Sequence, residues 1–289
     1  MTTITSRDNK WLKAFRAALR GKGPDPARNE PIGIEGPKLV EEALRSGLAV
    51  EALLVSESGE RAAAAILKAA NESEAGIPPS QILKTSDKLF ESVSGTEAPQ
   101  GVAALFRQPE WGLDDVLHGV GAMRGNSPLV VVLAAIQDPG NVGTILRSAE
   151  AFGAAGIFLT EGTVSPYNSK VLRGSAGSVF RLPFLQISSL ELIPLLRARG
   201  VRLLATSSHQ GTPLPQVSWT LPLAIFIGNE GAGLSRELTR QMDETVAIPQ
   251  ASQVESLNAG VAASIVLYEA ARSSSRLPVL SSQLARGQG

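Results

Sequence analysis

The chain has no cysteine and only two histidines, His118 and His209. The absence of cysteine excludes disulfides, thiolate metal sites and cysteine nucleophiles. The two histidines are far apart in the sequence and have no clustered carboxylates beside them. We therefore expect no metal site.

Long apolar runs are also missing. No stretch of 18 apolar residues occurs, and residues 1–7 lack the apolar core of a secretion signal. We therefore expect a cytoplasmic protein with no membrane partner. Neither sign of charge is in excess, because the chain has 27 basic and 27 acidic residues. Any contact with nucleic acid must then come from local patches rather than from the field of the whole protein.

The length and composition fit a globular protein of two domains, with 289 residues, 43% hydrophobic and 19% charged. We predict a first domain at 1–107 and a second at 128–272. Residues 108–127 carry proline, glycine and mixed polarity, and we predict a linker there. Residues 273–289 are predicted to be a polar tail.

The first domain opens with a predicted amphipathic helix over residues 6–20. One face is apolar, and the other carries Arg7, Lys10, Lys13, Arg16 and Arg20. Such a face is either solvated surface or a surface for phosphates. After the breaker-rich segment 21–31, a small α/β domain is predicted over 31–107, with strands at 32–34, 52–55 and 102–106 and helices at 38–46 and 61–70.

The second domain alternates apolar runs with helical patterns. Strands are predicted at 129–136, 157–159, 203–206, 224–227 and 245–248, and helices at 141–152, 190–199, 235–242 and 256–272. Alternation of this kind predicts an α/β fold with a mostly parallel sheet covered by helices.

Glycine, asparagine and serine follow two of these strands. The strand ending near Ile227 runs into Gly228-Asn229-Glu230-Gly231, and the next runs into Ile248-Pro249. Loops of this kind offer bare backbone groups at the carboxyl edge of a sheet, where open α/β folds bind small molecules. The glycine spacing does not fit a dinucleotide fingerprint, and Glu230 disfavours a phosphate ligand. The alternative is a flexible turn with Ser235 capping the next helix.

Several polar residues near helix starts have both a structural and a functional interpretation. Asn141 could be an N-cap, and Arg147 could pair with Glu150 on the surface. Ser256 is a suitable N-cap for the last helix, with Asn258 in its first turn. Each of these four residues could instead serve the site.

Two further stretches have a pattern of interest. Lys170 and Arg173 lie one turn apart on a predicted helix, which suits phosphate contacts or a solvated face. The segment 259–264 is rich in small residues, so another backbone is expected to approach the last helix closely.

Together these segments resemble a known family. NVGTILRSAEAFG (141–153), IFIGNEGAGLS (225–235) and AIPQASQVESLNAGVAASIVLYEA (247–270) are similar, in order and spacing, to the three motifs of the SpoU (TrmH-like) branch of the SPOUT RNA methyltransferases. SKVLRGSAG (169–177) matches as well. IGIEGPKLVEEAL (32–44) and SGTEAPQGVAALF (94–106) resemble that family's substrate-binding domain. The resemblance spans roughly residues 1–272.

The resemblance implies methylation of a ribose 2'-hydroxyl in RNA, with ribosomal RNA as the expected substrate. It implies a homodimer and S-adenosylmethionine bound in a C-terminal trefoil knot. By position, Gly228, Ile248 and Leu257 would contact the cofactor through the backbone, with Thr206 nearby. A non-catalytic RNA-binding or assembly protein on the same fold is one alternative, and a nicotinamide-dependent enzyme is another.

The resemblance also implies roles for the polar residues. Arg147 would activate the hydroxyl, supported by Asn141, Glu230, Ser256 and Asn258. Because arginine stays protonated, it could instead bind the adjoining phosphate or stabilise an alkoxide. Within this family, the expected RNA contacts are Arg7, Lys10, Lys38, Lys170 and Arg173, with Lys13 and Arg16 beside them. The third motif departs from the usual form, which tends to have methionine and glycines where Gln250, Ser252 and Gln253 stand.

Overall fold

The computed structural model describes residues 1–21, 23–24, 30–72, 76–120, 127–208, 210–251 and 256–274. His209, Ser252, Gln253 and residues 275–289 of the predicted tail lie outside the described residues. The chain forms two compact units. The first consists of Met1–Glu110 with Val164–Arg181, and the second of Trp111–Thr163 with Leu182–Gly289.

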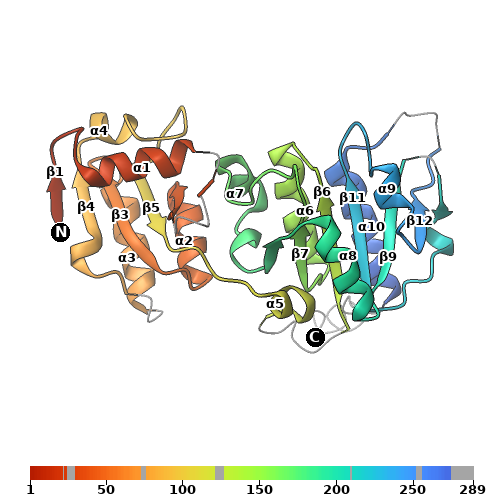
Figure 1. The fold of residues 1–289 in the computed structure, drawn as a ribbon. Helices are drawn as coiled ribbons and strands as arrows, with labels where there is room; N and C mark the ends of the chain where they lie inside the picture. Colours follow the sequence, from red (N-terminus) through yellow and green to blue (C-terminus); the bar gives the residue numbers. More distant parts are fainter. Residues whose placement is uncertain are drawn as a thin grey trace, which may run out of the picture. The chain divides into compact units, whose positions relative to one another are not determined.

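The first unit contains a five-stranded sheet in the order β1-β4-β3-β5-β2 (Figure 1). Its parallel strands are β1 (Thr2–Ile4), β3 (Val50–Ser56) and β4 (Ile82–Thr85), whereas β5 (Val102–Phe106) runs antiparallel to β2 (Ile32–Glu35) and β3. The strands expected at 32–34, 52–55 and 102–106 are confirmed. Strands β1 and β4 were not predicted.

Helices cover this sheet. They are α1 (Lys10–Arg20), α2 (Pro37–Arg45), α3 (Glu60–Glu72) and the short α4 (Asp87–Glu91), with a 3-10 turn η2 at Pro79–Gln81. Helix α1 begins at Lys10 and not at the expected residue 6, because the Asn9 side chain accepts a hydrogen bond from Trp11 N–H and caps it. Its apolar face, with Leu12, Phe15 and Leu19, is buried as predicted.

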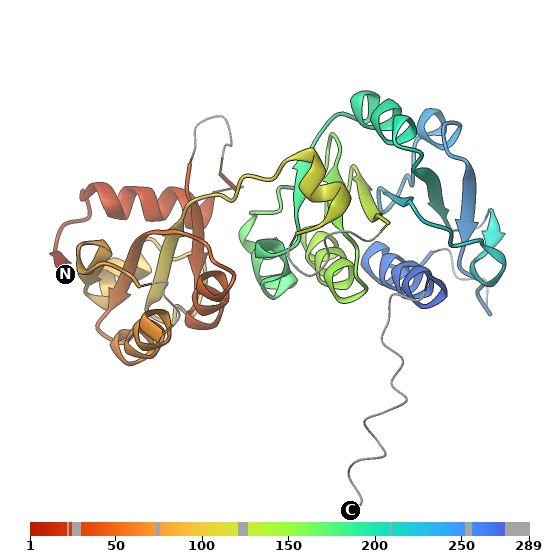
Figure 2. The same ribbon diagram turned by 90° about the horizontal axis from the view of Figure 1, so that it is seen from below.

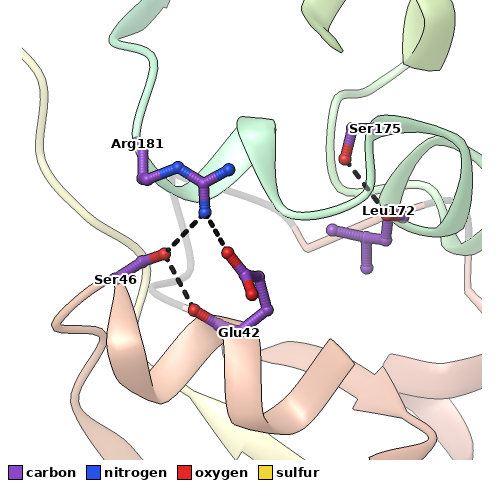
Figure 3. Close-up of polar contacts among 5 residues, drawn as sticks. All are labelled: Glu42, Ser46, Leu172, Ser175 and Arg181. Carbon is purple, nitrogen blue, oxygen red and sulfur yellow. Dashed lines mark hydrogen bonds and ion pairs between the residues drawn. The ribbon is translucent and has the colours of Figure 1, made fainter. Parts of the chain in front are cut away.

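The segment Val164–Arg181 belongs to the first unit, although it was predicted within the second domain. It contains α7 (Ser169–Ser175) and a 3-10 turn η4 (Ser178–Phe180). Arg181 Nη1 donates to Glu42 Oε1 at 2.5 Å and to Ser46 Oγ at 3.3 Å, at the end of α2 (Figure 3). Gly177 lies so close to α2 that an added Cβ would come within 2.3 Å of Glu42 Cγ. These contacts between residues distant in sequence leave no mark on local periodicity.

The second unit contains a seven-stranded, wholly parallel sheet in the order β10-β12-β9-β11-β6-β7-β8. Its strands are β6 (Leu129–Ala134), β7 (Gly156–Leu159), β8 (Phe184–Gln186), β9 (Arg202–Ser207), β10 (Thr212–Pro213), β11 (Leu223–Gly228) and β12 (Glu244–Ala247). The predicted parallel α/β architecture is confirmed. The edge strands β8 and β10 were not predicted, since each has only two or three residues.

Two layers of helices enclose the second sheet. They are α5 (Leu113–His118), α6 (Pro139–Ala151), α8 (Ser189–Ala198), α9 (Arg236–Thr239) and α10 (Ala259–Ser273), with a 3-10 turn η5 at Leu214–Gln216. Figure 2 shows α6 and α10 side by side on one face and α8 and α9 on the other. No helix in the described ranges has both the length and the apolar character needed to cross a bilayer.

Helix α5 occupies residues that were predicted as linker. Val116 and Leu117 of α5 are buried in one cluster with strand residues such as Val130 and Phe158. Gly156 of β7 lies so close that an added Cβ would be 2.8 Å from Val116 Cα. A six-residue helix is too short to show a 3.6-residue period, which is why the sequence did not reveal it.

The burial of α5 predicts that Leu117→Ala destabilises the protein by about 2–5 kcal/mol, because the substitution leaves a cavity in the core. Leu190→Ala is the matched control, since Leu190 of α8 is 76% exposed, and its free energy of unfolding should change by less than about 0.5 kcal/mol. Urea denaturation measures both. Equal stabilities for the two variants would show that α5 does not contribute to the core.

Candidate active site

A cavity of about 1020 Å³ lies at the carboxyl ends of β9, β11 and β12. Its lining includes all four residues expected to bind the cofactor, Thr206, Gly228, Ile248 and Leu257, together with Glu230 and Ser256. They come from the loops that follow the three strands and from the segment before α10. The volume suits a small organic molecule, and the position is where parallel sheets bind ligands.

The loop after β11 is a turn closed by its own backbone hydrogen bonds. Asn229 and Gly233 exchange backbone hydrogen bonds at 3.1 and 2.9 Å. The Asn229 side chain donates to the Ala135 carbonyl at 2.9 Å and accepts from the N–H groups of Gly231 and Ala232. Only glycine fits at 228, because an added Cβ would lie 2.3 Å from the Gly233 carbonyl carbon. Ser235 does cap α9, accepting from Leu238 N–H at 3.1 Å.

Glu230 joins this loop to the start of α6 and to the residues just before that helix. Its carboxylate accepts hydrogen bonds from Asn141 Nδ2 at 2.9 Å, Asp138 N–H at 3.1 Å and Gln137 N–H at 3.3 Å. Burial raises the pKa of the carboxyl, but these bonds and one from its own N–H outweigh burial, so the pKa lies below its ordinary value. Glu230 is therefore an ionised, fixed group at neutral pH and a weak base.

The helix caps differ from those expected. Asp138 caps α6, accepting from Gly140 N–H at 2.6 Å and Asn141 N–H at 3.0 Å. Asn141 is thus not the cap; its side chain is buried and donates to Glu230. Asn258, not Ser256, caps α10 through the N–H groups of Gly260 and Val261. Ser256 lies before the helix and lines the cavity.

Arg147 lies on α6, exposed, and is not part of the cavity lining. Its guanidinium forms no ion pair or hydrogen bond with any residue that the structure describes, so the alternative of a surface pair with Glu150 is not realised. Asn258 also lies outside the lining. The structure therefore gathers the four residues expected to bind a cofactor in one cavity and leaves Arg147 exposed on α6, outside the cavity lining.

Helices α6 and α10 approach each other closely, as the small residues predicted. An added Cβ on Gly260 would lie 3.1 Å from Thr144 Cβ. Ser148 and Ser264 share a hydrogen bond of 2.7 Å between their hydroxyls. This contact holds α6, which carries Arg147, against α10, which begins just after Leu257.

Sequence reasoning missed several cavity residues. Ser207 is the last residue of β9, Ser208 and Gln210 follow it, and Arg236 and Arg240 lie in or just after α9. Thr206 lies near the end of a predicted strand, and the loop after a parallel strand lies at the edge of the sheet where ligands bind. The residues that follow Thr206 could therefore have been predicted to line the cavity. Nothing in the local pattern singled out the two arginines.

The expected RNA-binding residues all belong to the first unit and are all exposed: Arg7, Lys10, Lys38, Lys170 and Arg173. The inclusion of α7 in this unit adds Lys170 and Arg173 to it. Lys10 Nζ lies 5.7 Å from the centre of the Trp11 ring. The unit thus carries cations available to a polyanion.

Part of the basic face of α1 has a structural role. Arg16 donates to the Ser92 carbonyl at 3.3 Å, and Arg20 to the Ser94 carbonyl at 2.8 Å. Lys13 pairs with Asp8 at 3.4 Å. Arg16 and Arg20 thus hold the loop after α4. By contrast, Arg7 and Lys10 form no ion pair or hydrogen bond with any residue that the structure describes.

Known proteins resemble both units of this chain. The SpoU rRNA Methylase family model matches residues 128–268, and the MRM3-like substrate binding domain matches residues 27–104. The 23S rRNA (guanosine(2553)-2'-O)-methyltransferase RlmP of Bacillus subtilis is 34% identical over 93% of this chain and 98% of its own length. The chain belongs to the SpoU rRNA methylase family.

Solved structures give the same result. The AdoMet-bound rRNA methyltransferase of Sinorhizobium meliloti is 32% identical with a TM-score of 0.76, covering 94% of this chain and 97% of that one. The SpoU methyltransferase AviRb of Streptomyces viridochromogenes, in complex with AdoMet, is 29% identical with a TM-score of 0.73, covering 91% of this chain and 97% of that one.

Within the described ranges, no group of three or more histidine, cysteine, aspartate or glutamate side chains could hold a metal ion.

The lowered pKa of Glu230 predicts a pH-dependent contribution to stability. The ordinary value is 4.5 and the folded value is lower, so the contribution is present above about pH 4.5 and is lost as the pH falls through the folded pKa. Wild type should therefore be more stable than Glu230→Gln at pH 7, and the difference should shrink below pH 4.5.

Denaturant titrations between pH 3 and pH 8 measure this difference. Glu237→Gln is the control, because Glu237 is an exposed residue of α9 outside the cavity lining. That variant should follow wild type throughout. A difference for Glu230→Gln that stayed constant with pH would rule out the proposed ionic origin.

Proposed function

We propose that this protein transfers a methyl group from S-adenosylmethionine to a ribose 2'-hydroxyl in ribosomal RNA. The observation that carries the proposal is the cavity in which Thr206, Gly228, Ile248 and Leu257 meet. Two relatives of known structure contain AdoMet. RlmP, whose substrate is 23S rRNA, matches along 98% of its length, which includes both units of this chain. An rRNA substrate supports a cytoplasmic location.

The residues of the cavity fit this cofactor. The closed turn at 228–234 presents backbone groups at close range, and the Glu230 carboxylate favours a cationic ligand over a phosphate. The cofactor supplies a methyl group on a sulfonium. Membership of the family supports a trefoil knot formed by the loops after β9, β11 and β12, which would hold the cofactor in a bent form.

The ribose hydroxyl must lose a proton as it gains the methyl group. Glu230 is unsuited to take it, because its hydrogen bonds hold the pKa low. We assign Asn141, Glu230 and Asn258 to positioning the loops, and Ser256 to the cavity edge. Arg147, charged and unpaired, would stabilise the developing alkoxide or hold the adjoining phosphate.

The homodimer is supported by an apolar stripe on α10. Val261, Ile265 and Tyr268 are 48%, 37% and 47% exposed, and their spacing places them on one face of the helix. Tyr268 packs edge-on against Phe152, with ring centroids 5.6 Å apart. A second copy of the chain would cover this stripe next to α6, and so next to Arg147.

The first unit would bind the RNA. Arg7, Lys10, Lys38, Lys170 and Arg173 would contact phosphates, which gives affinity without choice of sequence.

The proposed role of Arg147 predicts that Arg147→Ala lowers the turnover number about 10²–10³-fold, as expected for losing one group that stabilises developing charge. Binding of S-adenosylhomocysteine should be unchanged, because Arg147 lies outside the cavity. The assay measures transfer of tritiated methyl groups to rRNA, with calorimetry for the by-product.

Arg199→Ala, an exposed arginine at the end of α8, is the control and should retain full turnover. Full activity of Arg147→Ala would remove Arg147 from the catalytic residues. Wild-type protein that binds rRNA but transfers no label would contradict the proposed activity itself.

The assignment of α7 to RNA binding predicts that the double variant Lys170→Glu, Arg173→Glu binds RNA more weakly than wild type, whatever the nucleotide sequence of the RNA. The slope of log affinity against log salt concentration should fall by about 2, one for each lost phosphate contact. Affinity for S-adenosylhomocysteine should not change. Filter binding over a salt series measures this.

Arg61→Glu with Lys68→Glu makes the same charge change on α3 of the same unit, where both residues are exposed. If that control weakened RNA binding as much as the α7 variant, a general field and not a local contact would be responsible.

A further inference from the structure

Gln250 has a buried hydrogen-bonding atom that the fold leaves unused. Its side chain lines the cavity, two residues after Ile248. Its Oε1 atom is closed to solvent and has no hydrogen-bond partner in the part of the chain that the structure describes. A buried acceptor without a donor is costly and calls for an explanation.

Other side chains of the cavity already have partners within the protein. Thr206 Oγ1 donates to the Phe226 carbonyl at 2.9 Å. The amide of Asn229 is engaged on both its oxygen and its nitrogen, and the carboxylate of Glu230 accepts hydrogen bonds from Asp138 and Asn141. These groups shape the cavity, whereas Gln250 Oε1 is an acceptor without a structural task.

We propose that Gln250 recognises the adenine of the cofactor, with Oε1 accepting a hydrogen bond from the exocyclic amino group. The inference rests on the proposed function and names a specificity residue within the same site. The side chain turns about its flexible χ bonds to reach the base. Its unpaired oxygen favours that turn, because pairing removes the cost of the buried acceptor.

The chemistry of the amide selects adenine among the cofactor's donors. A glutamine amide offers an acceptor and a donor side by side, which matches the amino group and neighbouring ring nitrogen of adenine. The cationic ammonium and sulfonium groups are better met by a carboxylate, and Glu230 lines the same cavity. A neutral, partly buried amide is therefore best suited to the neutral base.

Calorimetry with two ligands tests the proposal. One is S-adenosylhomocysteine, and the other is its analogue with hydrogen in place of the exocyclic amino group. Wild type should prefer the first by about tenfold, the effect of one buried hydrogen bond. In Gln250→Met, which keeps the length of the side chain but removes the acceptor, the two ligands should bind within about twofold of each other.

Two variants serve as controls. Gln250→Glu retains an acceptor oxygen and should retain the preference. Gln216→Met makes the same substitution at an exposed glutamine of η5 outside the cavity lining and should also retain it. The ratio of the two affinities is the readout, so a general loss of stability would not imitate the effect.

Equal binding of both ligands to wild type would overturn the proposal, whether or not the variants fold. The proposal would also be overturned if Gln250→Met still preferred S-adenosylhomocysteine to the analogue without the amino group. The same holds if Gln250→Met changed the affinity lost on removing a ribose hydroxyl from the ligand and not the affinity lost on removing the amino group. Failure of wild type to bind either ligand would contradict the proposed function as a whole, and is distinguishable from these outcomes.

Discussion

The carboxylate of Glu230 connects the two central strands of the second sheet beyond their carboxyl ends. Strands β6 and β11 are paired in parallel up to Ala134 and Gly228, and past that point no ladder holds their loops together. Glu230, from the loop after β11, accepts hydrogen bonds from two backbone N–H groups and from Asn141 in the segment after β6. Asn229 adds a bond to the Ala135 carbonyl. The closed turn that lines the cavity depends on this cross-connection, since a loop with so many bare polar groups needs partners to keep one shape.

The contact between α6 and α10 extends the same constraint to the opposite side of the site. Gly260 and Ser264 allow the helices to touch at Thr144 and Ser148, and the cap residue Asn258 fixes where α10 begins. Ser256 and Leu257, immediately before the cap, are therefore held at the cavity edge. Arg147 is carried by the helix on the other side of this contact. A larger residue at 260 would push the two helices apart, so the small residues of α10 fix the distance between the cavity residues Ser256 and Leu257 and Arg147 on α6.

The sequence predicted the long central elements and the residues at their ends, because hydrophobic runs and glycine-rich turns leave a local pattern. The family resemblance, rather than a local pattern, assigned Thr206, Gly228, Ile248 and Leu257 to one site, and all four line the same cavity. Some short elements were missed, as β1, β8 and α5 show, because so few residues span too few repeats of a strand or helix period to identify the element. The association of 164–181 with the first unit could not be predicted either, because it rests on Arg181 meeting Glu42, a contact between residues far apart in sequence. The N-caps are not the two residues that the sequence suggested, Asn141 and Ser256: Asp138 caps α6 and Asn258 caps α10.

The electrostatics of the site favour a reaction without a dedicated protein base. Glu230 is the carboxylate within the cavity, and its hydrogen bonds stabilise the ionised form to the point where it binds a proton weakly. Arginine holds its proton at neutral pH and cannot accept another. In the proposed reaction, the hydroxyl becomes acidic only as its oxygen bonds to the methyl carbon, so the proton can leave late and to solvent. The protein then contributes by aligning the oxygen, carbon and sulfur atoms and by placing positive charge near the oxygen. A rigid cavity edge and a free, exposed guanidinium are the features that such a mechanism requires.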